Sequence, residues 1–387
     1  MPAADCKRVY IVAGEASGDL LTAPLVREMK RLQPDLSLRG VGGDRLQQEG
    51  MTLLHHHREL AAMGLVEVLR RWRRLSQALR EVERDILEFK PDLLLLVDFP
   101  GFNLILARRL RRALPKIVYY ISPKFWAWRY RRVVKLARLT DLVLCIFPFE
   151  PAHITRAGGR AIYEGHPLVD LVAADQDRAE YFLQHQLKTT QPLITFFPGS
   201  REQEIAQLLP PALEAAQILR RRHPAVQFAV HFASANLAGH YAESVIDTGL
   251  TALFGSSHNA MYHSDFAAVA SGTANLETAL AGTPQLMYYR FHPVSWLLAR
   301  WLVKLEYASP VNIVMERQVI PELLQDALCS RLVKQIDKYL AQPLEVAQAY
   351  TKEYDLLRAR LGKPGVTGRL AKNLQTVLYP TDTGINL

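Results

Sequence analysis

The sequence predicts an α/β protein with two parallel-sheet domains, and three observations lead to this fold class. The chain has 387 residues, which is longer than a single α/β core usually grows and favours two domains. Short apolar runs alternate with amphipathic stretches, as they do in βαβ units. The alternation stops in a polar stretch at residues 173–190 and then starts again. We therefore expect each half of the chain to form its own parallel sheet.

The predicted strands form two sets of similar size. The first set comprises residues 9–13, 36–41, 93–97, 117–121 and 142–147, and the second comprises residues 193–197, 226–232, 251–254, 266–270 and 285–289. We expect an N-terminal domain at 1–170, a C-terminal domain at 171–340, and a charged helical tail at 341–387 that packs back on the N-terminal domain or on a dimer partner. Such folds bind ligands beside the carboxyl ends of their strands, so the loops that follow the strands should carry function, around a cleft between the domains.

The composition excludes several classes of protein. A hydrophobic content of 49% with 22% charged residues is typical of a globular protein, and no run of about 20 apolar residues could span a membrane. The N-terminal residues lead directly into a predicted strand without the apolar core of a signal peptide, so we expect a cytoplasmic protein. The three cysteines are widely spaced, which disfavours disulfides and a zinc site. The net charge of +9 predicts an anionic partner: a membrane, a phosphorylated substrate or a nucleic acid.

A strand-to-helix turn in the second domain is a candidate for binding a diphosphate. The predicted strand at 193–197 is followed by Gly199, Ser200 and Arg201, and then by a predicted helix. Free N–H groups at the start of that helix and the guanidinium of Arg201 could together stabilise the phosphates, including the charge that develops on a leaving group. The alternative is an ordinary turn in which Ser200 caps the helix.

A second turn repeats this arrangement and suggests a nucleotide. Ser271, Gly272 and Thr273 follow the predicted strand at 266–270, and Glu277 comes in the first turns of the next predicted helix. A carboxylate at this place could accept hydrogen bonds from both ribose hydroxyls, as acidic residues do in dinucleotide folds. The alternative is that Glu277 is a solvated helix residue.

In the first domain, Asp98 is the candidate catalytic residue. It directly follows the apolar run LLLLV at 93–97, which is typical of a strand buried on both faces. A carboxylate at that strand end could act as a general base toward an acceptor hydroxyl. Alternatively, Asp98 only caps a turn.

The loop at residues 14–19 (GEASGD) follows the first predicted strand and contains Glu15 and Ser17. It does not fit Gly-x-Gly-x-x-Gly, so the sequence predicts no nicotinamide or flavin cofactor. The loop is expected to border an acceptor site. The alternative is a plain turn in which Ser17 or Asp19 caps the next helix.

No metal site is predicted. His55, His56 and His57 are consecutive, and neither a helix nor a strand would direct all three to one point, so we expect a solvated loop. The triplet at 175–177 (DQD) lies in the polar interdomain stretch and is expected to be linker.

Basic residues cluster in the first domain, where they suggest a membrane face. An amphipathic stretch at 65–79 mixes apolar and basic residues, and further basic clusters follow at 108–112 and 129–138. Such mixtures suit an anionic membrane surface, although a core-facing helix with a solvated charged face would look the same. No nucleic-acid motif accompanies the charge, so we expect no nucleic-acid partner. The predicted membrane face comprises Val66, Val68, Leu69, Arg70, Arg71, Trp72 and Arg73.

Eight short segments, taken together, resemble the lipid-A-disaccharide synthase family. They occur in order along the chain at 14–19 (GEASGD), 63–69 (MGLVEVL), 98–103 (DFPGFN), 122–129 (SPKFWAWR), 165–170 (GHPLVD), 197–201 (FPGSR), 271–277 (SGTANLE) and 321–325 (PELLQ). The resemblance implies an inverting GT-B glycosyltransferase that joins UDP-2,3-diacylglucosamine to 2,3-diacylglucosamine 1-phosphate (lipid X) and needs no metal. It also implies a homodimer at the cytoplasmic face of the inner membrane.

The resemblance assigns roles to individual residues. Asp98 matches the candidate base, and the positions associated with UDP are Arg201, Glu277, Asn312 and Gln325. The matching segments also place Asn103, Trp128 and His166 at the donor or acceptor cleft, with His166 at a presumed hinge.

The chain departs from the family's usual residues at three places. Lys124-Phe125 stands where a small polar and an aliphatic residue are commoner, Val311-Asn312-Ile313 replaces Pro-Asn-Leu, and Asn275 replaces Thr. These departures bear on acceptor and acyl-chain preference. The alternatives are a UDP-N-acetylglucosamine 2-epimerase, a peptidoglycan-type transferase, or a non-catalytic membrane-bound UDP-sugar sensor.

Overall fold

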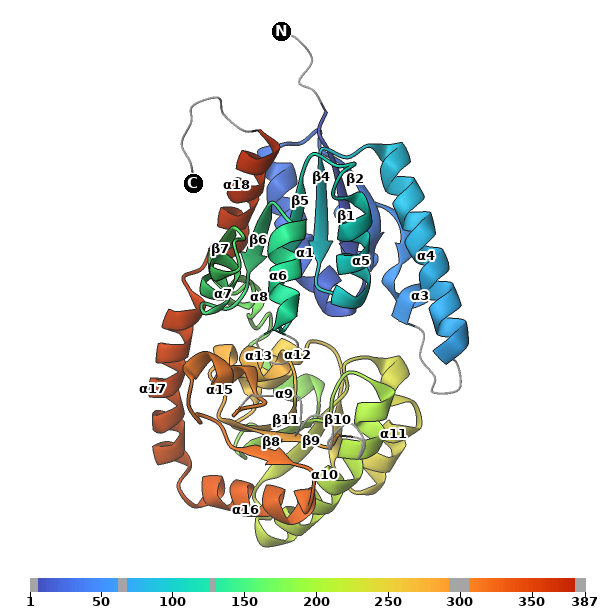
Figure 1. Cartoon of the computed structure of the whole chain (residues 1–387). Coiled ribbons are helices and arrows are strands. Elements are labelled where there is room, and N and C mark those ends of the chain that lie inside the picture. The colour runs from blue at the N-terminus through green and yellow to red at the C-terminus, as the bar shows by residue number, and fades with distance from the viewer. Residues whose placement is uncertain (1–5, 62–67, 126–129, 292–305, 380–387) are drawn as a thin grey trace. The chain divides into compact units, whose positions relative to one another are not determined.

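The computed structural model describes residues 6–61, 68–125, 130–291 and 306–379 (Figure 1). The chain divides into two compact units. Unit 1 contains residues 1–170 and 361–387, and unit 2 contains residues 171–360.

Unit 1 is built on a seven-stranded parallel sheet with the order β3-β2-β1-β4-β5-β6-β7. Its strands are β1 (Arg8–Ala13), β2 (Ser37–Gly42), β3 (Thr52–His56), β4 (Leu93–Val97), β5 (Ile117–Tyr120), β6 (Leu142–Cys145) and β7 (Ala161–Tyr163). The central strand β4 is fully buried, as its unbroken apolar run predicts.

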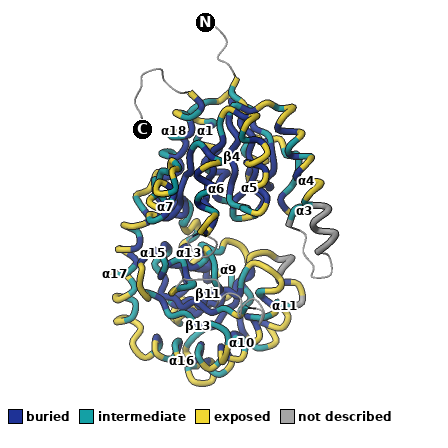
Figure 2. Tube along the Cα trace, viewed as in Figure 1, coloured by how far each residue is buried: buried dark blue, intermediate teal, exposed yellow. Residues whose placement is uncertain are grey.

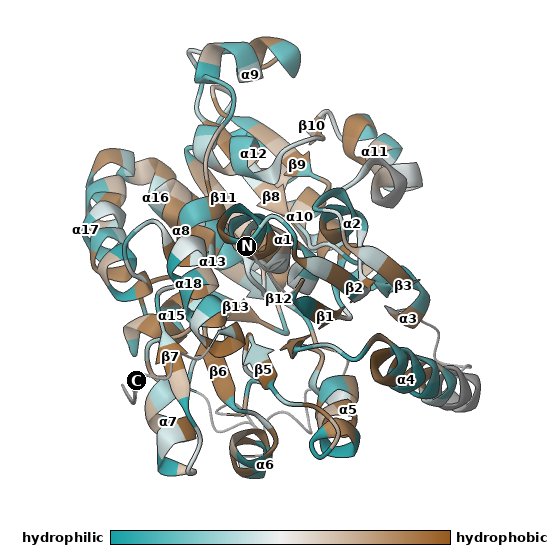
Figure 3. Cartoon of the chain, turned by 90° about the horizontal axis from the view of Figure 1, so that it is seen from above, coloured by the Kyte–Doolittle hydropathy of each residue, from teal (hydrophilic) through white to brown (hydrophobic). Residues whose placement is uncertain are grey.

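Helices cover both faces of this sheet. Helices α4 (Val68–Phe89), α5 (Pro100–Leu110), α6 (Arg131–Leu139) and α7 (Glu150–Arg156) lie along one face, and α1 (Ala16–Leu32) packs on α18 (Val366–Leu378) along the other (Figures 1 and 3). The short helices α2 (Asp44–Gln48), α3 (His57–Ala61) and α8 (Leu168–Leu171) complete the unit.

Unit 2 is built on a six-stranded parallel sheet with the order β10-β9-β8-β11-β12-β13. Its strands are β8 (Leu193–Phe197), β9 (Gln227–His231), β10 (Thr251–Leu253), β11 (Phe266–Ala270), β12 (Gln285–Tyr289) and β13 (Glu322–Leu324). Among its described residues, the helices are α9 (Arg178–Gln184), α10 (Glu202–Arg222), α11 (Ala235–Asp247), α12 (Ser257–His263), α13 (Ala274–Ala281), α15 (Pro310–Met315), α16 (Leu328–Ala341) and α17 (Pro343–Leu361). In both units the buried residues concentrate on the sheets, and the exposed ones on the outer sides of the helices (Figure 2).

The C-terminal tail is divided between the two units. The Tyr350 hydroxyl on α17 donates a hydrogen bond to the Gln285 carbonyl at 2.7 Å, and both residues belong to unit 2. Helix α18, in contrast, packs on α1 in unit 1. Segment 341–387, which we expected to behave as one tail, therefore contributes one helix to each core.

The three consecutive histidines lie on regular structure, contrary to the solvated loop expected from the sequence. His55 and His56 end β3, and His57 begins α3. His55 pairs with Glu59 and Glu81, while His56 pairs with Asp44. Within the described ranges no group of three or more His, Cys, Asp or Glu side chains is arranged to hold a metal ion. Among the same residues, no helix is both long enough and apolar enough to cross a membrane.

Candidate active-site residues

Asp98 lies at the carboxyl end of β4, between the ends of β1 and β5. Its backbone is left-handed, with φ of 43°, and that of Phe99 follows with φ of 46°. Two successive left-handed residues that are not glycine are strained, and such strain persists only where surrounding contacts enforce it. Here the Asp98 N–H donates to the Tyr120 carbonyl at 3.0 Å, and the Tyr119 hydroxyl donates to the Asp98 carbonyl. These contacts hold the backbone that carries the carboxylate at the strand end.

The environment of Asp98 suits a general base. Burial raises the pKa of its carboxyl to about 6; the charge of Glu15 acts in the same direction, and Lys124 opposes it. A carboxyl with this pKa is ionised at neutral pH and is still basic enough to take a proton in a transition state.

Asn103, which the resemblance places at the cleft, holds the backbone of Asp98 through a hydrogen bond. Its side chain is fully buried on α5, and its Nδ2 lies 2.8 Å from the Asp98 carbonyl, 3.1 Å from the Val97 carbonyl and 3.3 Å from the Val12 carbonyl. One amide group thus ties the ends of β1 and β4 together. This contact fixes the backbone that carries the candidate base.

The loop after β1 contains Glu15, whose charge acts on Asp98, and Asp19, whose role is structural. Glu15 is the N-cap position of α1 without a side-chain capping bond, and its charge acts on Asp98. Ser17 is half-buried in the first turn of α1. Asp19 is buried and caps α2 instead, accepting hydrogen bonds from the N–H groups of Gly43 at 2.7 Å and Leu46 at 3.2 Å.

Sequence reasoning missed Glu150, a buried carboxylate at this edge of the sheet. It accepts a hydrogen bond from the Ser122 hydroxyl at 2.5 Å through one oxygen, and from the N–H groups of Ile146 and Phe147 at 3.1 Å through the other. Glu150 thereby joins the loop after β5 to the loop after β6. The β5 loop carries Lys124, whose charge acts on Asp98. An acidic residue three positions after a predicted strand was the available signal.

In unit 2, the turn after β8 has the predicted form but different capping. Arg201, not Ser200, is the N-cap residue of α10. The Ser200 N–H donates to the Glu204 carboxylate at 3.0 Å, and the Arg201 Nη1 lies 3.4 Å from the other oxygen of that carboxylate. Gly199 has φ of 115°, a conformation that favours glycine. The Arg201 side chain is 60% exposed and can reach a ligand.

The turn after β11 lies beside the turn after β8, because the two strands pair in the sheet. Ser271 and Gly272 are half-buried and Thr273 is exposed. Glu277 on α13 is nearly buried, with His258 Nε2 at 3.8 Å. Burial raises the pKa of Glu277 to about 7. A carboxyl group kept out of water in this way is well suited to bind hydroxyl groups of a ligand.

Asn312, a position that the resemblance associates with UDP, makes a full set of hydrogen bonds within its own chain. Its side chain is fully buried; Nδ2 donates to the Ile320 carbonyl and to Glu322, and Oδ1 accepts from the N–H groups of Val319 and Ile320. These four bonds use the full capacity of the amide. Asn312 therefore anchors α15 to the segment before β13.

Gln325 also contacts its own chain. Its Oε1 accepts from the Phe291 N–H at 2.6 Å, and its Nε2 lies 3.3 Å from the Phe291 carbonyl. This pair of bonds connects the end of β13 to the residues that follow β12.

His166 is fully buried in unit 1 rather than exposed at a cleft. Its backbone N–H donates to the Leu361 carbonyl at 2.7 Å, and its ring Nδ1 accepts the Leu168 N–H at 3.2 Å. The ring packs against Phe147, and burial lowers the pKa of the imidazole to about 3. The neutral ring thus contributes both packing and a hydrogen bond. Trp128 and Val66 lie outside the described residues, as do the side chains of the predicted membrane-face residues 68–73, although their backbone forms the first turns of α4.

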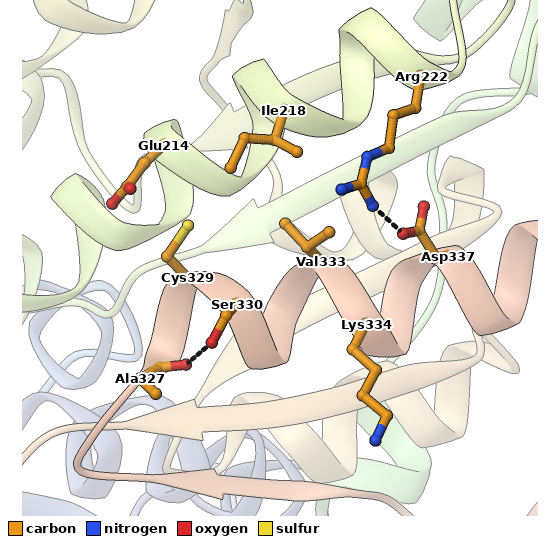
Figure 4. Close-up of a pocket in the computed structure, with 9 residues that line it drawn as sticks. All are labelled: Glu214, Ile218, Arg222, Ala327, Cys329, Ser330, Val333, Lys334 and Asp337. Carbon is orange, nitrogen blue, oxygen red and sulfur yellow. Dashed lines mark hydrogen bonds and ion pairs between the residues drawn. The ribbon is translucent and has the colours of Figure 1, made fainter.

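A pocket of about 660 Å³ lies between α10 and α16, and none of the predicted site residues lines it (Figure 4). Glu214 and Cys329 lie toward one end, and the ion pair of Arg222 with Asp337 lies toward the other. Both helices cover the outside of the sheet, so this pocket is a groove between neighbouring helices.

Comparison with known proteins identifies relatives that match nearly the whole length of the chain. A family model described as lipid-A-disaccharide synthetase matches residues 9–361. A lipid-A-disaccharide synthase of Geobacter sulfurreducens is 39% identical over 94% of this chain and 95% of its own. The corresponding protein of Myxococcus xanthus is 36% identical over 96% of this chain and 98% of its own.

Solved structures with a similar fold include a protein solved with UDP, a UDP-GlcNAc 2-epimerase and a glycosyltransferase. S. aureus MnaA, solved with UDP, has a TM-score of 0.67 at 13% identity and covers 96% of this chain, with 97% of its own chain matched. The UDP-GlcNAc 2-epimerase of Neisseria meningitidis has a TM-score of 0.63 at 11% identity, over 97% of this chain and 100% of its own. The calicheamicin glycosyltransferase CalG4 has a TM-score of 0.61 at 14% identity, over 96% of this chain and 98% of its own. At these identities the likeness concerns the fold, and it confirms the predicted GT-B architecture.

Proposed function

The chain belongs to the lipid-A-disaccharide synthase family of glycosyltransferases, and from this premise we propose its reaction in detail. The enzyme transfers 2,3-diacylglucosamine from UDP-2,3-diacylglucosamine to the 6-hydroxyl of 2,3-diacylglucosamine 1-phosphate. The products are a β-1,6-linked disaccharide 1-phosphate and UDP, and the configuration at the anomeric carbon is inverted.

The geometry of Asp98 is the observation that carries this proposal. It is a carboxylate at a buried strand end, on a strained backbone held by Tyr119, Tyr120 and Asn103, with a pKa raised to about 6. A general base that must take a proton from a sugar hydroxyl at neutral pH needs these properties.

In the proposed step, Asp98 removes the proton of the acceptor's 6-hydroxyl as the oxygen attacks the anomeric carbon. The bond between that carbon and the β-phosphate oxygen breaks, and its electron pair leaves with UDP. Because the attack and departure are in line, the α-linked donor gives a β-linked product. The proton stays on Asp98 until solvent removes it.

We propose that UDP binds to unit 2 at the carboxyl ends of β8 and β11. Gly199, Ser200 and Arg201 face the diphosphate, where the start of α10 and the guanidinium stabilise the departing charge. Ser271, Gly272 and Thr273 form the adjacent turn, which borders the nucleotide. Glu277 accepts hydrogen bonds from the ribose. Asn312 and Gln325 support this edge through the backbone contacts described above.

We further propose that unit 1 contacts an anionic membrane surface and that the enzyme acts as a homodimer. Support for membrane contact comes from α5 and α6, which lie side by side. Arg108 on α5 and Arg112 just after its end are exposed, as are Arg131, Lys135 and Arg138 on α6. Basic helices of this kind bind anionic lipid surfaces, from which a diacylated acceptor would enter.

Product analysis tests the proposed reaction. Purified enzyme is incubated with the diacylated donor and acceptor, and the product is examined by mass spectrometry and NMR. We expect a disaccharide 1-phosphate with a β-configured 1,6 linkage. An α linkage would contradict inversion, and epimerised donor formed without acceptor would support the epimerase alternative.

A further inference from the structure

The proposed diphosphate-binding turn already contains an anionic group from the protein itself. The Glu204 carboxylate accepts the Ser200 N–H at 3.0 Å and lies 3.4 Å from the Arg201 Nη1. The Glu204 side chain is 14% exposed, whereas that of Arg201 is 60% exposed. The carboxylate is thus tucked beneath the turn while the guanidinium faces outward.

The position of Glu204 depends on the glycine of the turn. A Cβ added to Gly199 would lie 2.5 Å from the Glu204 Oε2 and 2.7 Å from its Cβ. Glu204 therefore lies directly against the Gly199 backbone, in space that any other residue would fill. The φ of 115° at Gly199 is also accessible mainly to glycine.

This arrangement creates competition for the same donors. The Ser200 N–H has one hydrogen, and the carboxylate takes it. A diphosphate bound at this turn would bring further negative charge close to a carboxylate that is largely shielded from water, where repulsion between like charges is stronger than in bulk solvent. The acidic side chain therefore opposes the ligand that the turn otherwise attracts.

We propose that Glu204 limits how tightly the enzyme holds UDP and so promotes release of this product. Between turnovers the carboxylate satisfies the Ser200 N–H and steadies Arg201. When UDP is present, the same carboxylate repels the diphosphate. This inference rests on the proposed function, since it takes the turn at Gly199–Arg201 to be the diphosphate site.

Ordinary helix capping is the competing explanation, because a Glu in the first turn can bond a free N–H near the helix start. Both explanations predict that Glu204 stabilises α10. They differ in the sign of the effect on UDP: a pure cap that orders the turn would aid binding, whereas the proposed role opposes it.

The test measures the dissociation constants of UDP and of uridine by calorimetry for the wild type, Glu204→Gln and Glu202→Gln. Glutamine keeps an oxygen for the Ser200 N–H but removes the charge. Glu202 is the matched control, because it is an exposed carboxylate in the same turn of α10.

We expect Glu204→Gln to bind UDP about tenfold more tightly than the wild type, and uridine binding to be unchanged. The gain in UDP affinity should shrink as salt is added. Glu202→Gln should change UDP binding by less than about twofold.

Three results would overturn the inference: UDP binding by Glu204→Gln that is unchanged or weaker, an equal gain for uridine, or an equal gain in Glu202→Gln. Arg201→Ala separates this failure from failure of the proposed site. If Arg201→Ala weakens UDP binding while Glu204→Gln has no effect, only the role of Glu204 is wrong. If Arg201→Ala leaves UDP binding unchanged, the diphosphate site itself is misplaced.

Discussion

At the scale of single residues, Asp98 determines whether the proposed chemistry takes place. Asp98→Asn keeps the size of the side chain and removes its basicity, so turnover should fall by about 10²–10⁴-fold while UDP binding stays within about twofold. Steady-state kinetics and calorimetry measure the two effects. Turnover at the wild-type level would eliminate Asp98 as the base.

The pH dependence of the wild type follows from the same group. Because the pKa of Asp98 is raised to about 6, kcat/KM should decline as the pH falls through about 6, when the base becomes protonated. A profile that stays flat down to about pH 5 would assign the proton transfer to another group.

Asp98 should also reduce the stability of the folded protein. The pKa of its carboxyl rises from 3.8 to about 6 on folding. Between pH 3.8 and about pH 6, the folded state therefore binds more protons than the unfolded state. The free energy of unfolding decreases as the pH rises through this window. Asp98→Asn removes this cost, and we expect it to raise the free energy of unfolding at pH 7.5 by about 1–2 kcal/mol. Chemical denaturation at pH 7.5 and pH 4 checks this, and a gain of equal size at both pH values would contradict the argument.

The proposed role of Glu277 predicts how tightly the nucleoside binds. If it binds the ribose, Glu277→Ala should weaken binding of both UDP and uridine about tenfold, through the lost hydrogen bonds. Glu243→Ala, which removes an exposed carboxylate of α11, is the control. Unchanged uridine affinity in Glu277→Ala would place the ribose elsewhere.

At the scale of structural elements, Glu150 joins the loop after β6 to the loop after β5, which carries Lys124. Glu150→Gln replaces one acceptor oxygen by a donor, which conflicts with Ser122 or with the two backbone N–H groups. We expect a stability loss of about 1–3 kcal/mol and, because Lys124 is then held less firmly, an upward shift in the pKa that governs kcat/KM.

The pH profile of kcat/KM shows whether Glu150 positions Lys124 near Asp98 or only stabilises the fold. Ser122→Ala removes one of the three bonds and should produce a smaller shift in the same direction. A lowered melting temperature with an unchanged pH profile in Glu150→Gln would mean that Glu150 stabilises the fold without acting on Asp98.

The central strands could be predicted from the sequence, whereas three edge strands could not. The predictions for β4, β8, β11 and β12 match the observed bounds. The missed strands β3, β7 and β13 all lie at sheet edges. Because an edge strand is covered less completely, its sequence lacks the continuous apolar run that identifies a buried parallel strand.

The candidate site could also be predicted only in part from the sequence. Strand-end positions predicted Asp98 and the two turns of unit 2, since a polar residue after an apolar run is visible in the sequence. The hydrogen bonds at Asn312 depend on how the chain turns back over the next ten residues. The burial of His166 depends on Leu361, which is distant in the chain. No local pattern reveals such contacts.

At the scale of the whole molecule, the proposed role of the basic surface of unit 1 can be tested by membrane binding. Reversing Arg131, Lys135 and Arg138 to Glu should weaken binding to vesicles of anionic lipid by about a hundredfold or more, since each basic residue contributes about 1 kcal/mol near such a surface. Vesicle sedimentation measures this.

The matched control reverses Arg221, Lys334 and Lys338 in unit 2, which are also exposed. It makes the same change in net charge, so equal loss of binding in both variants would show that net charge alone, and not the face formed by α6, determines the attraction.

The most direct test of the central claim is UDP release by the purified enzyme in EDTA, with the diacylated UDP-glucosamine donor, in the presence and absence of diacylglucosamine 1-phosphate. We predict release only when the acceptor is present, and its loss in Asp98→Asn. Release at the same rate without acceptor, or undiminished release by Asp98→Asn, would contradict acceptor-dependent transfer with Asp98 as the base.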